Sequence, residues 1–142
     1  MQLVFIHGAP ATGKLTVGRA LSAHTGSPLV DNHAAIDLAR HVIDFGEPGF
    51  WDLVHNLRIT TFTGAARAGV PLIVATAAYS HPVDAHLVQD YERAIAAYGG
   101  AILPVHLTCS RETLMTRVSL PDRAKRGKIA TCDGLTRYIT QH

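Results

Sequence analysis

The chain has 142 residues and a formal net charge of only +2, with 47% hydrophobic and 17% charged residues. This is the length of one domain with enough apolar residues for a core, which argues against disorder, and no apolar run approaches the ~20 residues that cross a bilayer. Residues 1–6 lack the length and basic start of a signal peptide, and the two cysteines lack the spacing of a zinc site or disulfide framework, so we expect a cytoplasmic protein.

Strand-like and helix-like segments alternate along a single predicted domain, residues 1–142. Short, continuously apolar runs predict strands buried on both faces, at residues 3–6, 29–30, 71–78 and 101–107. Helical spacing of apolar residues predicts helices at residues 13–24, 34–45, 50–68, 84–98 and 110–120, and a weak one at 134–140. The alternation predicts right-handed βαβ crossovers and an α/β fold with a parallel sheet, in which ligands bind beyond the carboxyl ends of the strands.

A glycine-rich loop lies between the first predicted strand and the first predicted helix. Its residues are Gly8, Ala9, Pro10, Ala11, Thr12, Gly13, Lys14, Leu15 and Thr16. Glycine permits backbone angles that let the main chain approach a phosphate, and the helix start adds the positive end of its dipole. Lys14 can reach over such a loop toward the β- and γ-phosphates. The alternative is a simple turn with an exposed lysine, but the strand–loop–helix context favours nucleotide phosphate binding.

A basic segment follows the fourth predicted strand and its helix. Arg117, Arg123 and Arg126 suit the stabilisation of a phosphoryl group in transfer, because guanidinium groups bind its oxygens. Pro121 and Gly127 suit a mobile lid, which we place at about residues 117–130. We expect the lysines of this segment, Lys125 and Lys128, to be solvated. A basic surface or a nucleic-acid patch is the alternative, although no aromatic residues are interleaved for base stacking.

The loop spacing G-x-P-x-x-G-K-x-T resembles that of adenylate kinase-like enzymes. Together with the Thr16-Val17-Gly18-Arg19 start of the helix, it is similar to adenylate, shikimate and gluconate kinases, and to shikimate kinase-like "AAA family ATPase" proteins. The resemblance to these P-loop small-molecule kinases implies ATP, Mg²⁺ and transfer of the γ-phosphoryl group to a small acceptor. Leu15 departs from the usual motif, so we assign the hydroxyl group on the Mg²⁺ side to Thr16.

Asp31 follows the second predicted strand and is the predicted catalytic acid. The resemblance implies that an acid here assists Mg²⁺ or accepts a proton from the acceptor hydroxyl, while Asn32 and His33 could contact the acceptor. The alternative is that Asp31 caps the next helix. The third predicted strand ends without an acid, so magnesium would depend on Thr16, water, phosphate oxygens and Asp31.

The resemblance also predicts a P-loop NTPase fold with three α/β/α layers and strand order 2-3-1-4. A fifth strand, usual in these kinases, is missing because residues 131–142 contain no apolar run. The leading functional hypothesis is an ATP-dependent phosphotransferase, with Lys14, Asp31, Arg117 and Arg123 as catalytic residues. A nucleotide-binding protein with weak or no transferase activity is the alternative, and a nucleic-acid-stimulated ATPase is a third.

Overall fold

The computed structural model describes residues 1–79, 82–120 and 128–141. The elements follow one another as β1 (Gln2–His7), α1 (Lys14–Thr25), β2 (Leu29–Val30), α2 (Asn32–Ala39), α3 (Phe50–Arg67), β3 (Leu72–Ala77), α4 (Ala85–Ala96), β4 (Ala101–His106), α5 (Arg111–Val118) and α7 (Cys132–Gln141). Each predicted strand is therefore present. No helix in this part of the chain is long and apolar enough to cross a membrane.

The four strands form one parallel sheet in the order β2-β3-β1-β4, as predicted. Central strand β1 pairs along its whole length with both neighbours, so that Ile6 lies opposite Thr76 of β3 and Val105 of β4. Parallel pairing brings the carboxyl ends of all four strands to the same edge of the sheet. The phosphate-loop candidate, Asp31 and the segment before α5 all start from that edge.

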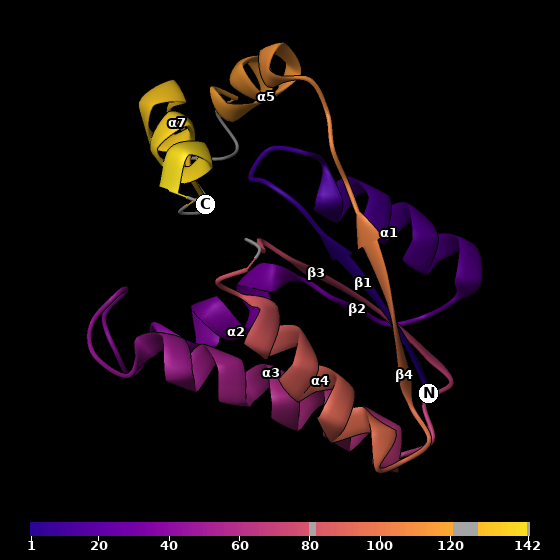
Figure 1. The fold of residues 1–142 in the computed structure, drawn as a ribbon. Coiled ribbons are helices and arrows are strands. Elements are labelled where there is room, and N and C mark those ends of the chain that lie inside the picture. The colour runs from indigo at the N-terminus through magenta and orange to yellow at the C-terminus, as the bar shows by residue number, and fades with distance from the viewer. Residues whose placement is uncertain (80–81, 121–127, 142) are drawn as a thin grey trace.

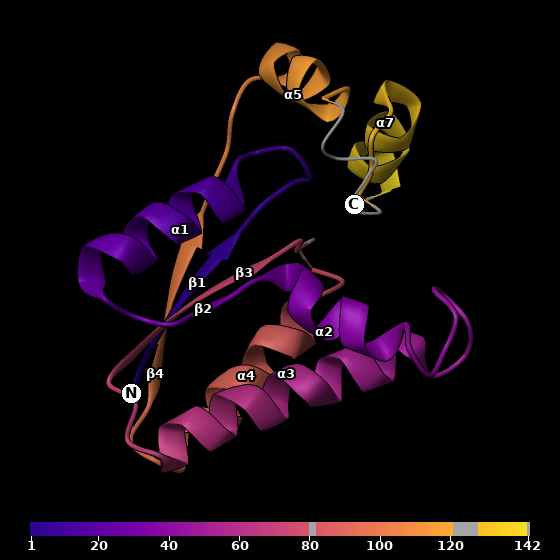
Figure 2. The ribbon, with the colours of Figure 1, turned by 180° about the vertical axis from the view of Figure 1, so that it is seen from behind.

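Helices cover the two faces of the sheet in a three-layer α/β/α arrangement (Figures 1 and 2). Helix α1 lies on one face, where Val4, Ile6 and Val74 form a buried cluster. Helices α3 and α4 lie on the other face, over Leu3 and Phe5, and α2 packs beside α3. Helices α5 and α7 lie beyond the carboxyl ends of the strands (Figure 1).

The close packing of α1 on the sheet depends on Gly18, the buried residue of this helix. A Cβ atom there would lie 3.0 Å from the Thr76 methyl group and 3.1 Å from a Leu29 methyl group. Glycine thus lets the helix axis approach β2 and β3 closely. This fixes the start of α1, and with it the phosphate-loop candidate, against the strand tips.

Strand β4 is an edge of the sheet and carries a proline. The N–H groups of Ala101 and Leu107 donate to the carbonyl oxygens of Met1 and His7. The backbone N–H groups of the odd-numbered residues of β4 therefore point toward β1. Pro104 therefore turns its missing N–H toward the open side, the position in which a strand tolerates proline. An edge of this kind discourages pairing with a further strand.

Helix α2 is shorter than predicted. It ends at Ala39, whereas the apolar spacing predicted a helix through Phe45. Beyond it the pattern becomes irregular, because the Ala39 carbonyl accepts both the Val42 N–H at 3.1 Å and the Ile43 N–H at 3.0 Å, and Gly46 adopts a φ of 85°. The resulting irregular connection runs from Arg40 to Gly49 and lies at the far left of Figure 1.

Candidate active site

The loop between β1 and α1 curls tightly through three residues with positive φ. These are Gly8 at 142°, Ala11 at 71° and Gly13 at 97°. Thr12 closes the curl, because its hydroxyl group and its N–H both donate to the Ala9 carbonyl, at 2.9 and 3.4 Å. Ala11 is the only described residue other than glycine with positive φ, so the loop holds a backbone conformation that an alanine adopts at a cost.

The first turn of α1 presents its amide groups next to this loop. Gly13 is the N-cap residue, no side chain caps the helix, and the first turn contains no acid. The N–H groups at a helix start have no partner within the helix and carry the positive end of its dipole. This end of α1 therefore suits an anion.

Lys14 folds back over the loop. Its Nζ donates to the carbonyl oxygens of Gly8 and Ala9, both at 2.7 Å. The ammonium group thus lies against the amides of the loop, where it can share the binding of a polyphosphate.

The α5–α7 pair packs directly on the loop through Ala11, which forms a buried cluster with Leu114, Val118 and Leu135. From α5, Arg117 extends back to the loop, and its Nη1 donates to the Thr12 carbonyl at 3.4 Å. The helix that follows β4 thereby places a guanidinium group beside the phosphate-loop candidate. The other predicted arginines, Arg123 and Arg126, and also Lys125, lie outside the described residues.

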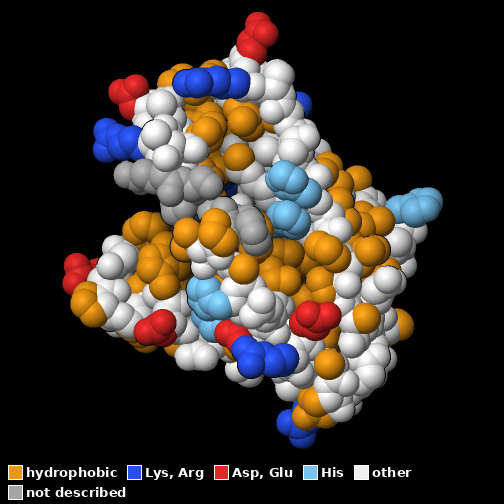
Figure 3. Space-filling model, in the orientation of Figure 1, with side chains coloured by type: hydrophobic (Ala, Val, Ile, Leu, Met, Phe, Trp, Pro, Cys, Tyr) orange, Lys and Arg blue, Asp and Glu red, His pale blue; other side chains and the backbone are white. Residues whose placement is uncertain are grey.

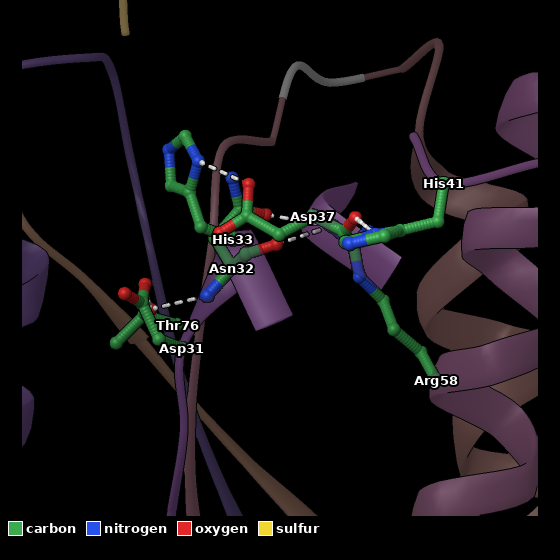
Figure 4. A network of polar contacts seen from close by, with 7 residues as sticks. All are labelled: Asp31, Asn32, His33, Asp37, His41, Arg58 and Thr76. Atoms are coloured by element: carbon green, nitrogen blue, oxygen red, sulfur yellow. Dashed lines mark hydrogen bonds and ion pairs between the residues drawn. The ribbon is translucent and has the colours of Figure 1, made fainter. Parts of the chain in front are cut away.

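Asp31 occupies the N-cap position of α2, but its carboxylate makes no capping hydrogen bond. The Thr76 hydroxyl group donates to Asp31 Oδ1 at 3.3 Å and accepts the Asn32 N–H at 3.1 Å (Figure 4). The carboxylate is therefore fixed between the tips of β2 and β3. It lines the same pocket as the phosphate-loop candidate. Asp31 thus stands at the cap position without using its carboxylate oxygens to cap the helix.

Asn32 and His33 continue the same wall of the site. Arg58 of α3 donates to the Asn32 side-chain oxygen at 2.7 Å, an anchor that the sequence did not reveal (Figure 4). Burial and the nearby Lys128 lower the pKa of His33. Its Nδ1 is buried without a hydrogen bond to any described residue and lies 3.9 Å from Asp37 Oδ1, while His33 itself lines the pocket.

Most of these groups line one pocket of about 800 Å³. It brings together Pro10 to Thr16 of the loop with Asp31 and Arg117, whereas Gly8 and Ala9 do not line it. The expectation that Lys128 is solvated was wrong, because it is half-buried in the pocket wall. The sequence also did not predict the lining residues Arg19, Ile36, Arg40, Phe45, Trp51, Leu120, Ile129 and Tyr138.

The oxygen donors of the pocket fit magnesium held together with a nucleotide. The described residues contain no group of three His, Cys, Asp or Glu side chains that could hold a metal by themselves. However, the Thr16 hydroxyl group and the Asp31 carboxylate line the same pocket. Mg²⁺ in nucleotide sites takes only one or two protein oxygens in addition to phosphate oxygens and water. Leu15, also in the lining, offers no donor.

A ring cluster supports the loop from the other side of β1. His7 stacks on His106 with ring centroids 4.9 Å apart, and Tyr79 meets the His7 ring edge-on at 5.0 Å. The His7 Nδ1 is buried without a hydrogen bond to the described part of the chain. Burial, followed by the charges of His106 and Lys14, lowers the pKa of His7 from the ordinary 6.5. The cluster is thus built for a neutral His7.

Acidification should therefore destabilise the protein in part through His7. Because the folded chain takes up this proton less readily than the unfolded chain, the contribution of His7 to stability is complete above pH 6.5 and falls as the pH decreases below it. We expect His7→Phe, which keeps a ring in the stack, to lose less of its unfolding midpoint between pH 7.5 and 5.5 than the unmodified protein. Thermal unfolding at the two pH values measures this, and equal losses would contradict it.

Solved structures with this fold include P-loop small-molecule kinases. Shikimate kinase from Acinetobacter baumannii, in complex with shikimate, aligns with a TM-score of 0.61 and 16% identity over 97% of this chain and 74% of that one. Shikimate kinase from Bacteroides thetaiotaomicron aligns with a TM-score of 0.64 and 21% identity over 98% of this chain and 76% of that one. A sugar kinase from Janibacter sp. aligns with a TM-score of 0.56 and 19% identity over 92% of this chain and 77% of that one. No family model matches the chain, and no curated protein matches it significantly.

Proposed function

We propose that the chain is an ATP-dependent phosphotransferase that moves the γ-phosphoryl group to a hydroxyl group of a small molecule. The observation that carries this proposal is the single pocket lined by Lys14 and the phosphate loop, Asp31 at the tip of β2 and Arg117 of α5. An anion cradle, a carboxylate and a guanidinium group are what phosphoryl transfer requires. The kinases that share the fold support the same class of reaction.

In the proposed reaction the acceptor hydroxyl oxygen forms a bond to the γ-phosphorus, and the bond from that phosphorus to the β–γ bridging oxygen breaks. The Asp31 carboxylate accepts the hydroxyl proton, and ADP leaves with the bridging oxygen. Lys14 and the first amides of α1 bind the phosphates, while Arg117 stabilises charge on the transferring group. Thr16, with Asp31, would hold Mg²⁺, which would supply positive charge to balance that of the phosphates.

Label transfer tests the proposal directly. The protein is incubated with γ-labelled ATP, Mg²⁺ and a panel of sugars, nucleosides and shikimate-like acids. The proposed function requires acceptor-dependent transfer of label.

A nucleotide-binding protein with little or no transfer activity is the second candidate. Leu15, at the usual place of the magnesium-binding hydroxyl group, favours it, as does Ala77, which ends β3 where an acid would assist the metal. Calorimetric ATP binding without label transfer to any acceptor would support this candidate. Turnover that depends on added polynucleotide would instead support an ATPase that acts with nucleic acid.

Asp31→Asn should separate the role of the carboxylate from that of the cap position. Asparagine caps a helix as well as aspartate does, so α2 should be retained. Without a proton acceptor, transfer should fall by about 10²–10⁴-fold. The fall is measured as the initial rate of label transfer, with ATP affinity followed by calorimetry.

Asp37→Asn is the matched control, since Asp37 lies on the same helix, does not line the pocket and approaches it only through His33, 3.9 Å away. It should leave transfer close to that of the unmodified protein. If both variants lost activity equally, a general disturbance of α2 would explain the result, and the proposed role of Asp31 would be wrong.

A further inference from the structure

The carboxylate of Asp31 has no acidic neighbour in the pocket. Among the described residues that line the pocket, Asp31 is the only acid. Strand β3, which lies beside it, ends with Thr76 and Ala77. Acidic side chains elsewhere project from the surface, as the red ones in Figure 3 do. The orientation of this one carboxylate therefore decides what an acid can do in the pocket.

The hydrogen bonds at Thr76 have a fixed direction. The Asn32 backbone N–H lies 3.1 Å from Thr76 Oγ1 and can only donate, so the hydroxyl oxygen accepts there. The single proton of the hydroxyl group is then directed to Asp31 Oδ1, 3.3 Å away (Figure 4). Asp31 Oδ2 accepts no hydrogen bond from the described part of the chain. Thr76 thus holds one carboxylate oxygen and leaves the other available.

Packing fixes the rotamer of Thr76. The residue is buried, and its methyl group lies so close to Gly18 of α1 that a Cβ atom there would be only 3.0 Å away. A β-branched side chain in such a site is held at one χ1 angle, so the hydroxyl group stays on the side of Asp31. Helix α1 also carries Lys14 and Thr16. One side chain therefore contacts both the helix of the phosphate loop and the acid.

Arg58 holds the start of α2 from the opposite side. Its Nη2 donates to the Asn32 side-chain oxygen at 2.7 Å and to the Asn32 carbonyl at 3.4 Å (Figure 4). A guanidinium group has no acceptor, so the amide oxygen of Asn32 must face it. This anchor does not involve Thr76. Loss of the Thr76 hydroxyl group should consequently disturb the Asp31 carboxylate more than the helix that follows it.

We propose that Thr76 is a positioning residue that holds the Asp31 carboxylate in its working orientation. The hydroxyl group turns Oδ1 toward β3 and leaves Oδ2 to a bound molecule. The tip of β3 thus contributes a hydroxyl group that orients the acid of β2, at the place where a second acid would otherwise assist the metal. This inference rests on the proposed function for the role of Asp31.

Thr76→Val tests the inference, because valine keeps the shape of the side chain and the packing on Gly18 but lacks the hydroxyl group. ATP is titrated by calorimetry in excess Mg²⁺ and in EDTA. Affinity in EDTA should be unchanged, which shows that the variant is folded with an intact phosphate loop. The gain in affinity that Mg²⁺ gives should fall at least about tenfold, as is usual when a group that orients a metal-binding carboxylate is removed.

Label transfer gives a second measurement on the same variant. The rate at saturating ATP and acceptor should fall at least about tenfold, because a misoriented carboxylate accepts the hydroxyl proton poorly. The KM for ATP in excess Mg²⁺ should not fall. A loss of packing alone would lower the unfolding midpoint without this pattern.

Two further variants separate the hydroxyl group from the fold. Thr76→Ser restores the hydroxyl group without the methyl group, so it should retain most of the Mg²⁺-dependent affinity and of the transfer rate. Thr61→Val is the matched control, because Thr61 is exposed on α3, donates only to the Leu57 carbonyl of its own helix and does not line the pocket. It should leave all these values unaltered.

The inference is overturned if Thr76→Val keeps both the Mg²⁺-dependent affinity and the transfer rate, or if Thr76→Ser loses as much as Thr76→Val. Failure of the proposed function is a separate outcome. A chain that transfers no label, but loses its Mg²⁺-dependent affinity in Thr76→Val and not in Thr76→Ser, would keep the positioning role and lose the kinase. Label transfer that Thr76→Val does not change would do the reverse, and a chain with neither Mg²⁺-dependent ATP binding nor transfer would overturn both.

Discussion

Lys14→Ala is expected to lower phosphoryl transfer by at least about a hundredfold, because it removes the one cation that the phosphate loop itself provides. The Lys14 ammonium group lies 2.7 Å from the Gly8 and Ala9 carbonyl oxygens, which hold it against the loop. Nucleotide affinity should fall as well, since the β- and γ-phosphates lose a charge-assisted partner. Label transfer and calorimetry with ATP measure the two effects.

Lys14→Arg distinguishes charge from shape at the same position. It retains the positive charge, but its planar fork does not fit a cradle in which two carbonyl oxygens receive one compact ammonium group. We therefore expect Lys14→Arg to recover little of the lost transfer. Arg137→Ala, on the exposed side of α7, should leave transfer and ATP affinity unaltered. Normal transfer by Lys14→Ala would contradict the assignment of the phosphate loop.

The sheet could be predicted because its signal is local. Strands buried on both faces appear as continuous apolar runs, and the runs around Leu3 to Ile6 and residues 71–78 stand out from the helical spacing beside them. The position of the phosphate loop also follows from adjacent residues, since it needs only a strand before Gly8 and a helix after Gly13.

The end of α2 could not be predicted because it depends on packing far away in the sequence. Helix propensity changes little from Arg40 to Phe45, so the spacing of the apolar residues predicted that the helix would continue to Phe45. In the structure Ile43 packs against the core formed by α2 and α3, and the chain must turn to reach it. The same turn brings Arg40 and Phe45 to the pocket, which explains why neither was a predicted site residue.

The α5–α7 side of the pocket was hidden for a similar reason. Arg117 could be predicted from its place in a basic segment, but Tyr138 of α7 lies at the pocket while α7 packs beside α5. That packing depends on Leu135 meeting Leu114, a contact that no short-range pattern encodes. The sequence pattern predicted a helix in the region of α7, but it could not predict which face of that helix packs against α5.

Gly8→Ala should be the most destabilising single substitution in the loop. A Cβ atom at Gly8 would lie 2.3 Å from the Leu107 carbonyl oxygen, a backbone atom that cannot rotate away, and the φ of 142° is one that side-chain-bearing residues rarely adopt. The two costs together should lower the free energy of unfolding by at least about 3 kcal/mol. Urea unfolding followed by Trp51 fluorescence measures this value.

Two other glycines separate the contributions. Gly69 has a φ of 74° but open space around it, so Gly69→Ala should show the backbone cost alone, about 1–2 kcal/mol. Gly64 lies inside α3 with open space, so Gly64→Ala should stabilise the protein by up to about 1 kcal/mol. If Gly8→Ala unfolded at the same urea concentration as Gly69→Ala, the close approach of the loop to β4 would be wrong.

The cost at Gly8 also connects the edge strand to the chemistry of the loop. Leu107 donates its N–H to the His7 carbonyl at 2.8 Å, so the last pairing of β4 with β1 holds the Leu107 carbonyl against Gly8. Relief of the clash in Gly8→Ala would have to displace the loop from β4 or break this pairing. Either movement shifts the Gly8 carbonyl oxygen, which accepts a hydrogen bond from Lys14 Nζ. Any folded fraction of the variant should therefore bind ATP at least about tenfold more weakly. Normal ATP affinity in a folded Gly8→Ala protein would show that the position of the loop does not depend on β4.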